Sequence, residues 1–179
     1  MRTGVSWRGV RGLTGTVVAA AALVSASGCT VPVGAVSGIS VTEDGHLLGV
    51  IAACGHRIDG ATVYVDGPDA DHSPTVGTWT AVRPVTSGVT TWTLDTPSPG
   101  WTTDMPLAPF KARTEYALYG WTKDNAWSSA DATFTQADVK RLTPGKVRYD
   151  TETDDGREVA VTVPLSRFKD RACKDFQGS

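Results

Sequence analysis

Residues 115–135 read EYALYGWTKDNAWSSADATFT and give the strongest indication of the fold. Two runs rich in aromatic residues, Thr and Ala, Glu115–Thr122 and Trp127–Thr135, are separated by the short segment Lys123–Ala126. Aromatic and β-branched residues favour strands, and a short polar segment between two such runs is typical of a hairpin loop. The stretch therefore predicts an antiparallel β-hairpin.

Strand patterns of the same kind occur on both sides of this hairpin. Apolar and polar residues alternate, and Asp-Gly pairs at 44–45 and 155–156 mark two further turns. The segment 47–54, LLGVIAAC, is nearly all apolar and predicts a central strand buried on both faces. The expected strands are 39–43, 47–54, 61–66, 76–82, 89–94, 115–122, 127–135, 148–153 and 157–163. Such regular spacing is typical of a sandwich or barrel, and we expect a mainly β fold, an antiparallel β-sandwich.

Two short helices are expected within this β-rich chain. Residues 135–138 match a helix-capping box, and Pro144-Gly145 ends that helix. Pro164 begins the second helix, in which apolar residues recur along one stripe. The stripe consists of Leu165, Phe168, Ala172 and Cys173. The prolines and the glycine within 97–109 predict a long loop there.

The first 28 residues have the features of a secretory signal peptide. Three arginines precede an apolar or small-residue segment of about 14 residues, which is too short to span a bilayer. The following Ala26-Ser27-Gly28-Cys29 resembles the lipobox of bacterial lipoproteins, although Ala26 stands where Leu is usual. The resemblance implies that the helical signal peptide is removed and that Cys29 carries a thioether-linked diacylglycerol. The alternative is a plain signal peptide that contains a cysteine.

The lipobox resemblance divides the chain into three parts. They are a signal peptide at 1–28, an acylated cysteine with a short tether at 29–37, and one β-rich domain at 38–179. The protein is then expected on the extracytoplasmic face of the cell membrane, with the lipid anchor as its membrane contact. The signal peptide holds three of the 17 basic residues and none of the 19 acidic ones, so its removal changes the formal net charge from −2 to −5. This charge favours solubility and argues against a nucleic-acid partner.

Two further resemblances concern the domain itself. The hairpin at 115–135 resembles the closing hairpin of immunoglobulin-like and fibronectin-type modules, which implies an immunoglobulin-like sandwich. The segments Cys54-Gly55-His56, Asp59-Gly60 and Leu118–Thr122 resemble small lipoproteins of high-GC Gram-positive bacteria. The second resemblance implies an envelope location and carries no activity with it.

Two cysteines remain once Cys29 is assigned to the lipid anchor. Cys54 and Cys173 form an even pair in an oxidising compartment, which predicts a disulfide. Cys54 closes an apolar strand and Cys173 lies on the apolar stripe of the last helix, so both side chains are expected to point towards one core. Two separate buried thiols are the alternative.

Five tryptophans lie beyond the signal peptide, and they are the most suggestive candidates for ligand binding. Trp79, Trp92 and Trp121 lie on expected strands and are assigned to the core. Trp101 lies in the expected loop and Trp127 beside a polar turn, so we expect this pair at the surface. Exposed aromatic rings can stack on sugars, and Trp101 and Trp127 are therefore the candidate residues for glycan binding.

Motifs for catalysis or metal binding are absent from the sequence. The three histidines lack ligand spacing, and no G-x-S-x-G motif occurs. Asp150, Glu152 and Asp154 recur at every second residue as in a calcium loop, but the required Gly and the final Glu are missing. These acids are interpreted as a solvated turn. We expect no catalytic residue, no metal and no cofactor.

The sequence therefore indicates a non-catalytic, lipid-anchored module that binds a partner or supports the cell envelope. A glycan or an envelope protein is the expected partner. A small cell-envelope hydrolase is the rival hypothesis, and it requires a cleft with converging polar groups and a titratable group with a strongly perturbed pKa.

Overall fold

The computed structural model describes residues 31–67 and 73–177. Within these ranges the prediction of a mainly β fold with two short helices is confirmed. The elements are β1 (Val33–Val41), β2 (Leu47–Ala53), β3 (Ile58–Val65), β4 (Thr75–Val85), β5 (Gly88–Thr93), β6 (Trp101–Met105), β7 (Glu115–Trp121), β8 (Ser128–Ala130), β9 (Ala132–Thr135), α1 (Gln136–Val139), β10 (Lys146–Glu152), β11 (Glu158–Pro164) and α2 (Leu165–Gln177).

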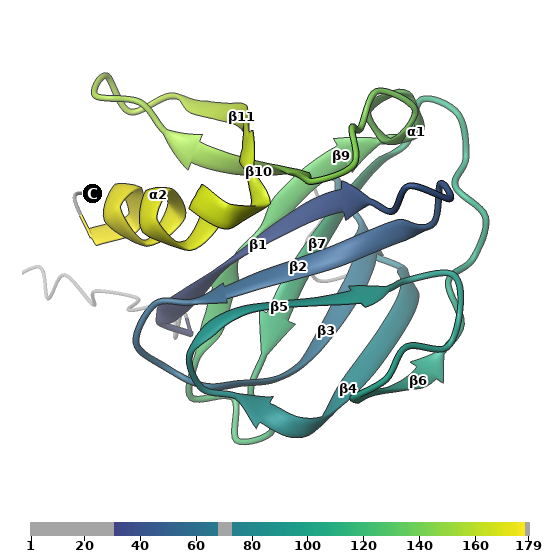
Figure 1. The fold of residues 1–179 in the computed structure, drawn as a ribbon, viewed down its shortest axis with the longest axis horizontal. Helices are drawn as coiled ribbons and strands as arrows, with labels where there is room; N and C mark the ends of the chain where they lie inside the picture. Colours follow the sequence, from purple (N-terminus) through teal and green to yellow (C-terminus); the bar gives the residue numbers. More distant parts are fainter. Residues whose placement is uncertain (1–30, 68–72, 178–179) are drawn as a thin grey trace, which may run out of the picture.

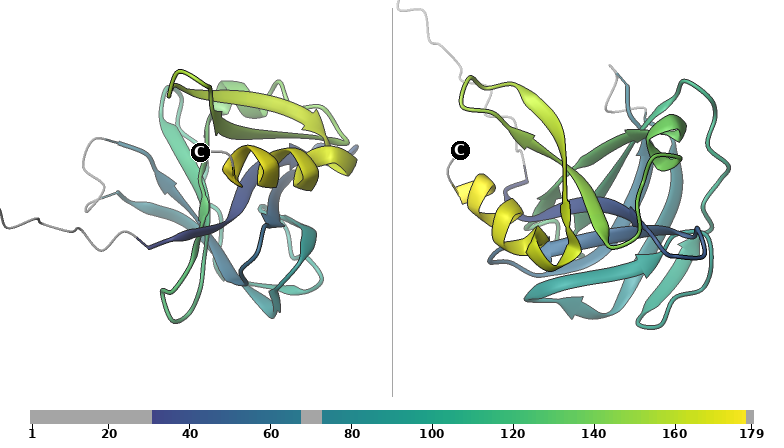
Figure 2. Two further views of the ribbon diagram at one scale, coloured as in Figure 1. Left: turned by 90° about the vertical axis from the view of Figure 1, so that its left-hand side faces the viewer. Right: turned by 45° about the horizontal axis from the view of Figure 1, so that its top comes forward.

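All of these strands belong to one hydrogen-bonded sheet. Its order is β11-β10-β1-β8-β7-β3-β4-β6, while β2 pairs with β1 and β5, and β9 pairs with β7. The strands from β5 through β1 and β7 to β6 curve round into a nearly closed barrel (Figure 1 and Figure 2). Two separate stacked sheets are not confirmed, and an immunoglobulin-like arrangement lacks support.

Aromatic stacking covers the place where the barrel does not close by hydrogen bonds. In the described part of the chain, β5 pairs with β2 and β6 pairs with β4, but no ladder joins β5 to β6. The indole rings of Trp92 in β5 and Trp101 in β6 stack there, with ring centroids 4.1 Å apart and planes inclined by 19°. Side-chain packing thus continues the barrel wall across this seam.

The hairpin predicted from residues 115–135 is confirmed, with one interruption. β7 pairs with β9 from Glu115 opposite Thr135 to Leu118 opposite Ala132, and near the turn Trp121 pairs with Ser128 in β8. β8 also runs parallel to the start of β1, where the hydroxyl oxygens of Ser129 and Ser37 lie 2.6 Å apart. Asp131 lies at the break between β8 and β9, where the chain leaves one pairing for the other.

The main hydrophobic core fills the barrel. Its largest side chains are Trp79, Trp92, Tyr116, Phe134, Ile39, Ile51, Ile58 and Leu118, each at most 2% exposed. Gly49 allows Trp92 into this space, because a Cβ at position 49 would lie 2.4 Å from Cζ2 of the indole. The assignment of Trp79 and Trp92 to the core is confirmed.

A second core lies outside the barrel, between the outer face of β1 and β2 and the unit formed by β10, β11 and α2. Figure 2 shows α2 running alongside the hairpin formed by β10 and β11. The buried members are Val36, Val50, Ala52, Val147, Tyr149, Phe168 and Ala172. Gly38 permits the close approach, since a Cβ there would lie 2.5 Å from Cγ1 of Val147 and 3.2 Å from Cζ of Phe168.

The predicted disulfide between Cys54 and Cys173 is confirmed, with a Cα–Cα distance of 5.3 Å. Both residues pack against the second core. The bond ties the end of β2 to α2 across 119 residues of sequence. It therefore fastens the C-terminal unit to the barrel.

Both helices lie where the sequence predicts them, whereas the strands β6 and β1 differ from expectation. Thr135 and Asp138 form the predicted capping box of α1, and Phe168 and Ala172 lie buried on the predicted stripe of α2. The expected loop at 97–109 contains β6, a short edge strand that pairs with β4. Residues 33–37, expected within the tether, form the first half of β1.

Cys29 and the expected signal peptide lie outside the described residues. Among the described helices, none is both long and apolar enough to cross a membrane.

Candidate functional site

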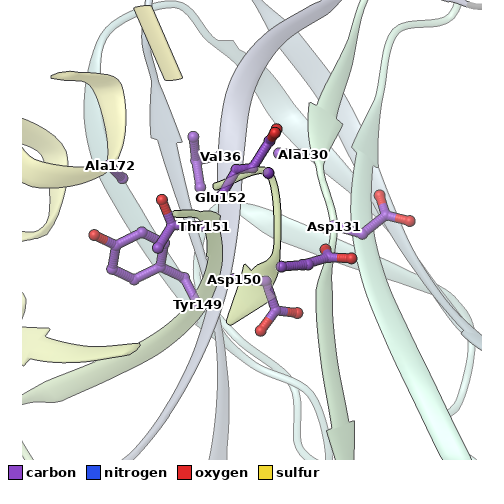
Figure 3. A pocket seen from close by; sticks show the side chains of 10 residues that line it. Val36, Ala130, Asp131, Tyr149, Asp150, Thr151, Glu152 and Ala172 are labelled. Carbon is purple, nitrogen blue, oxygen red and sulfur yellow. The ribbon is translucent and has the colours of Figure 1, made fainter. Parts of the chain in front are cut away.

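A pocket of about 450 Å³ lies where the β10–β11 hairpin and α2 meet the outer wall of the barrel (Figure 3). Its lining comes from β1, β8, β10, β11, α2 and the connections beside them. The lining residues are Val36, Ala130, Asp131, Tyr149, Asp150, Thr151, Glu152, Gly156, Glu158 and Ala172. The pocket thus combines apolar side chains with four carboxylates.

The register of the hairpin brings three of these carboxylates to one side. Asp150 and Glu152 alternate along β10 and therefore share a face of the hairpin. Glu158 in β11 pairs directly with Glu152. Like charges at directly opposed positions destabilise a sheet. The hairpin therefore carries a local repulsion that a cation between the two exposed glutamates would relieve.

Asp150 is held in place by hydrogen bonds from Thr133 in β9. Its Oδ2 accepts from the backbone N–H of Thr133 at 2.5 Å and from the Thr133 hydroxyl at 2.6 Å. Nη1 of Arg148 lies 3.9 Å from Oδ1 of the same carboxylate. Asp150 is buried, so these contacts fix its position in the pocket wall.

Asp131 has the most unusual environment in the pocket. Its Oδ2 accepts a hydrogen bond of 2.5 Å from the hydroxyl of Tyr64, which lies on the outer face of β3. Burial raises the pKa of Asp131 to about 6, and the charges of Asp66, Glu158 and Asp150 act in the same direction, while the Tyr64 hydrogen bond opposes them. The pKa of Tyr64 is raised in turn, by burial and by the hydrogen bond to Asp131.

The apolar part of the lining belongs to the second core. Val36, Tyr149 and Ala172 are buried there, and the ring of Tyr149 packs edge-on against Phe168 with centroids 5.2 Å apart. These contacts make the floor rigid. A ligand with an alkyl portion would bury that portion on this floor.

The pocket is strongly biased towards cations. No lysine or arginine occurs among the residues that line it in the described part of the chain. Arg148 is directed to Asp150, to the more distant Asp138 and to the carbonyl oxygen of Thr133. At an effective dielectric constant near 20, a cation about 4 Å from one carboxylate gains about 4 kcal/mol before the cost of desolvation. Several carboxylates together therefore favour an ammonium or guanidinium group.

The tryptophans singled out from the sequence do not form a common surface. Trp101 is only 9% exposed because it stacks on Trp92, so its expected surface position is wrong. Trp127 is half-buried and stacks on His56, with centroids 3.2 Å apart. Trp121, assigned to the core, is instead half-buried on the outer face of the barrel.

Sequence reasoning singled out Asp150 and Glu152 only as members of a solvated turn, and it did not single out Asp131. The available signal for Asp131 was a charged residue inside an otherwise uncharged strand run, SSADATFT. Among the described residues, no group of three or more His, Cys, Asp or Glu is placed to hold a metal ion.

Comparison with known proteins adds no assignment: no protein-family model matches the chain, and neither a curated protein nor a solved structure is significantly similar to it.

Proposed function

We propose that this protein is a lipid-anchored, extracytoplasmic binding module whose acidic pocket takes an ammonium or guanidinium group on a short alkyl chain. The observation that carries the proposal is the lining itself: in the described part of the chain it contains Asp131, Asp150, Glu152 and Glu158 beside apolar residues, and no lysine or arginine. The directly paired and exposed Glu152 and Glu158 support it further, because a cation between them would relieve their repulsion.

The anchor hypothesis agrees with a ligand that is met at the cell surface. The lipobox-like segment ends at Cys29, and β1 begins at Val33. Four residue steps reach at most about 14 Å, so an acyl chain on Cys29 would keep the pocket close to the membrane. The cationic group would then belong to a free amine or to a basic side chain of an envelope protein.

The test uses agmatine and the peptide Gly-Lys-Gly as cationic probes, with butanol as the uncharged probe. Calorimetric titration of the purified protein should detect both cations and not butanol. Replacing the two exposed glutamates, in the double variant Glu152→Gln/Glu158→Gln, should weaken binding at least about tenfold, since two of the four charges are removed. Agmatine binding without peptide binding would point to a free amine as the ligand.

The matched control is Asp154→Asn, which removes an exposed acid from the same hairpin without touching the pocket lining. It should change the affinity less than about twofold, because salt screens a charge at the tip of the turn. If the control and the double variant weaken binding equally, the effect is one of net charge and the pocket is not the site.

A small hydrolase is the second candidate, and Asp131 is the observation that favours it. A carboxyl group with a pKa of about 6 in a pocket wall can give or take a proton near neutral pH. Chromogenic ester and glycoside substrates test this role. Hydrolysis that is lost in Asp131→Asn would replace the binding proposal, whereas inertness of the wild type would argue against catalysis on these substrates.

A further inference from the structure

The outer face of β3, β4 and β7 carries an aromatic ring laid flat against the sheet. Gly60 pairs with Trp121, and a Cβ at position 60 would lie 2.2 Å from Cζ2 and 2.4 Å from Cη2 of the indole. The bare backbone of Gly60 therefore lets the ring lie down on the strand. The indole Nε1 donates a 3.0 Å hydrogen bond to the hydroxyl of Thr62, which fixes the ring in its plane.

Hydroxyl groups surround this ring in a regular array. Residues that pair across strands share a face of the sheet, so the register places Thr62 beside Tyr119 on β7 and beside Thr78 on β4. Thr80 pairs with Gly60 and donates a 2.6 Å hydrogen bond to Asp104. The face thus offers one indole bordered by threonine and tyrosine hydroxyls.

A hollow of about 270 Å³ lies next to the ring. It is lined by Thr62, Tyr64, Ser73, Thr75, Tyr119 and Asp131. The rings of Tyr64 and Tyr119 meet edge to face, with centroids 5.6 Å apart, and both are half-buried. The Tyr64–Asp131 hydrogen bond holds one wall. The geometry is therefore preformed, with aromatic walls and polar groups at fixed positions.

We propose that this face binds a neutral oligosaccharide of β-linked pyranose units, with one sugar ring stacked on Trp121 and the next reaching the hollow at Tyr64 and Tyr119. A β-linked pyranose presents axial C–H bonds on its ring face, which match the electron-rich face of an indole. Its equatorial hydroxyls project sideways, towards the hydroxyls of the half-buried Thr78 and Tyr119.

The charge of the face selects against acidic sugars. Among the described residues that line the hollow, Asp131 is the one with a carboxyl group, and none is a lysine or arginine. An anionic sugar would meet a negative wall without a compensating cation. A neutral sugar instead finds hydroxyls that both donate and accept hydrogen bonds. This site is distinct from the acidic pocket, although the two share Asp131 in their walls.

Cellohexaose and chitohexaose are the probes, titrated into the purified ¹⁵N-labelled protein while the indole N–H signals are followed by NMR. The Trp121 signal, identified by its loss in Trp121→Phe, should shift on addition of at least one probe. Trp121→Ala should weaken binding at least about tenfold, because the stacking surface is removed. Trp121→Phe keeps an aromatic ring and should therefore reduce the affinity less than Trp121→Ala does.

Trp127→Ala is the matched control, because it removes another half-buried indole that stacks on His56 rather than lying on this face. It should leave the affinity within about twofold of the wild type.

Binding of neither probe to the wild type would overturn the proposal, as would equal binding by Trp121→Ala. If Trp121→Ala does not fold, the wild-type titration decides: a shift of the Trp127 signal without one at Trp121 also overturns the proposal. Agmatine binding is measured in the same samples, so failure here is distinguished from failure of the acidic pocket.

Discussion

Asp131 shows how a single side chain can lie outside the reach of sequence patterns. Its neighbours Ala130 and Ala132 continue a strand-like run, so the sequence offers no reason for a break at this position. The break arises because β8 pairs in parallel with β1 while β9 pairs with β7. The partner of Asp131, Tyr64, lies 67 residues away in the chain. Neither contact has a local signature.

The expected positions of Trp101 and Trp121 are wrong for a related reason. A tryptophan in a Pro- and Gly-rich segment is expected at the surface, but Trp101 is covered by Trp92 from a strand with which it shares no ladder. Trp121 is expected in the core because large aromatic residues on strands usually fill it, yet Gly60 opens space for this ring on the outer face. Cys54 and Cys173 were predictable, because their apolar neighbours place both towards a core.

Asp131→Asn should change how stability depends on pH. The folded-state pKa of Asp131, about 6, lies above the ordinary value of 3.8, so the folded chain keeps a proton that the unfolded chain has released. This contribution makes the free energy of unfolding fall as pH rises from about 4 to about 6, by at most about 3 kcal/mol. Below pH 4 the carboxyl group is protonated in both the folded and the unfolded chain, so Asp131 adds no pH dependence there. The asparagine cannot ionise and should lose this pH dependence.

Urea unfolding at pH 4, 5, 6 and 7 measures the effect. The stability of Asp131→Asn relative to the wild type should rise with pH up to about 6 and then stay level. Asp154→Asn, in an exposed turn, serves as the control and should parallel the wild type. A stability difference that is the same at all four pH values would show that Asp131 ionises as readily when folded as when unfolded.

At the scale of elements, the sequence predicted those whose determinants are local. The capping box at Thr135 and Asp138 and the glycine turns at 45 and 156, with φ of 89° and 77°, lie where the sequence placed them. β6 was missed because its five residues have four exposed members and owe their extended form to pairing with β4. Likewise, the small residues at the start of β1 form a strand because β2 and β8 flank them.

Cys173→Ser should loosen α2 before it affects the barrel. The disulfide closes a loop of 119 residues, which in the chain-entropy model restricts the unfolded state by at most about 4–5 kcal/mol. We therefore expect the unfolding midpoint to fall by at least about 5 °C. Hydrogen exchange should increase first in α2, because the barrel core does not involve this helix.

The double variant Cys54→Ser/Cys173→Ser separates loss of the bond from the presence of a free thiol. Both variants should behave alike. Unchanged exchange in α2, together with an unchanged midpoint, would mean that the second core alone holds the helix. Mass spectrometry of the wild type without reductant should find neither Cys54 nor Cys173 as a free thiol.

For the whole molecule, strand alternation limited the fold to a few architectures without choosing among them. A sandwich and a barrel both need strands with one buried face, so the pattern of apolar residues fits either. The difference lies in which edges pair, and the decisive pairings are the β1–β8 and β2–β5 ladders between distant segments. Long-range pairing of this kind has no periodicity that a single sequence reveals.

The proposed location of the molecule depends on acylation of Cys29, and Cys29→Ser is the variant that tests it. Two acyl chains hold a protein stably on a membrane, whereas the formal charge of −5 expected after removal of the signal peptide disfavours binding to anionic lipids. Without the acyl chains, the variant should therefore appear in the medium or remain an unprocessed precursor. A fatty-acid probe fed to the cells should label the wild type and Cys173→Ser, which keeps Cys29, but not Cys29→Ser. Equal labelling of wild type and Cys29→Ser would refute the anchor, and the acidic pocket and the proposed oligosaccharide site at Trp121 would then belong to a freely diffusing protein.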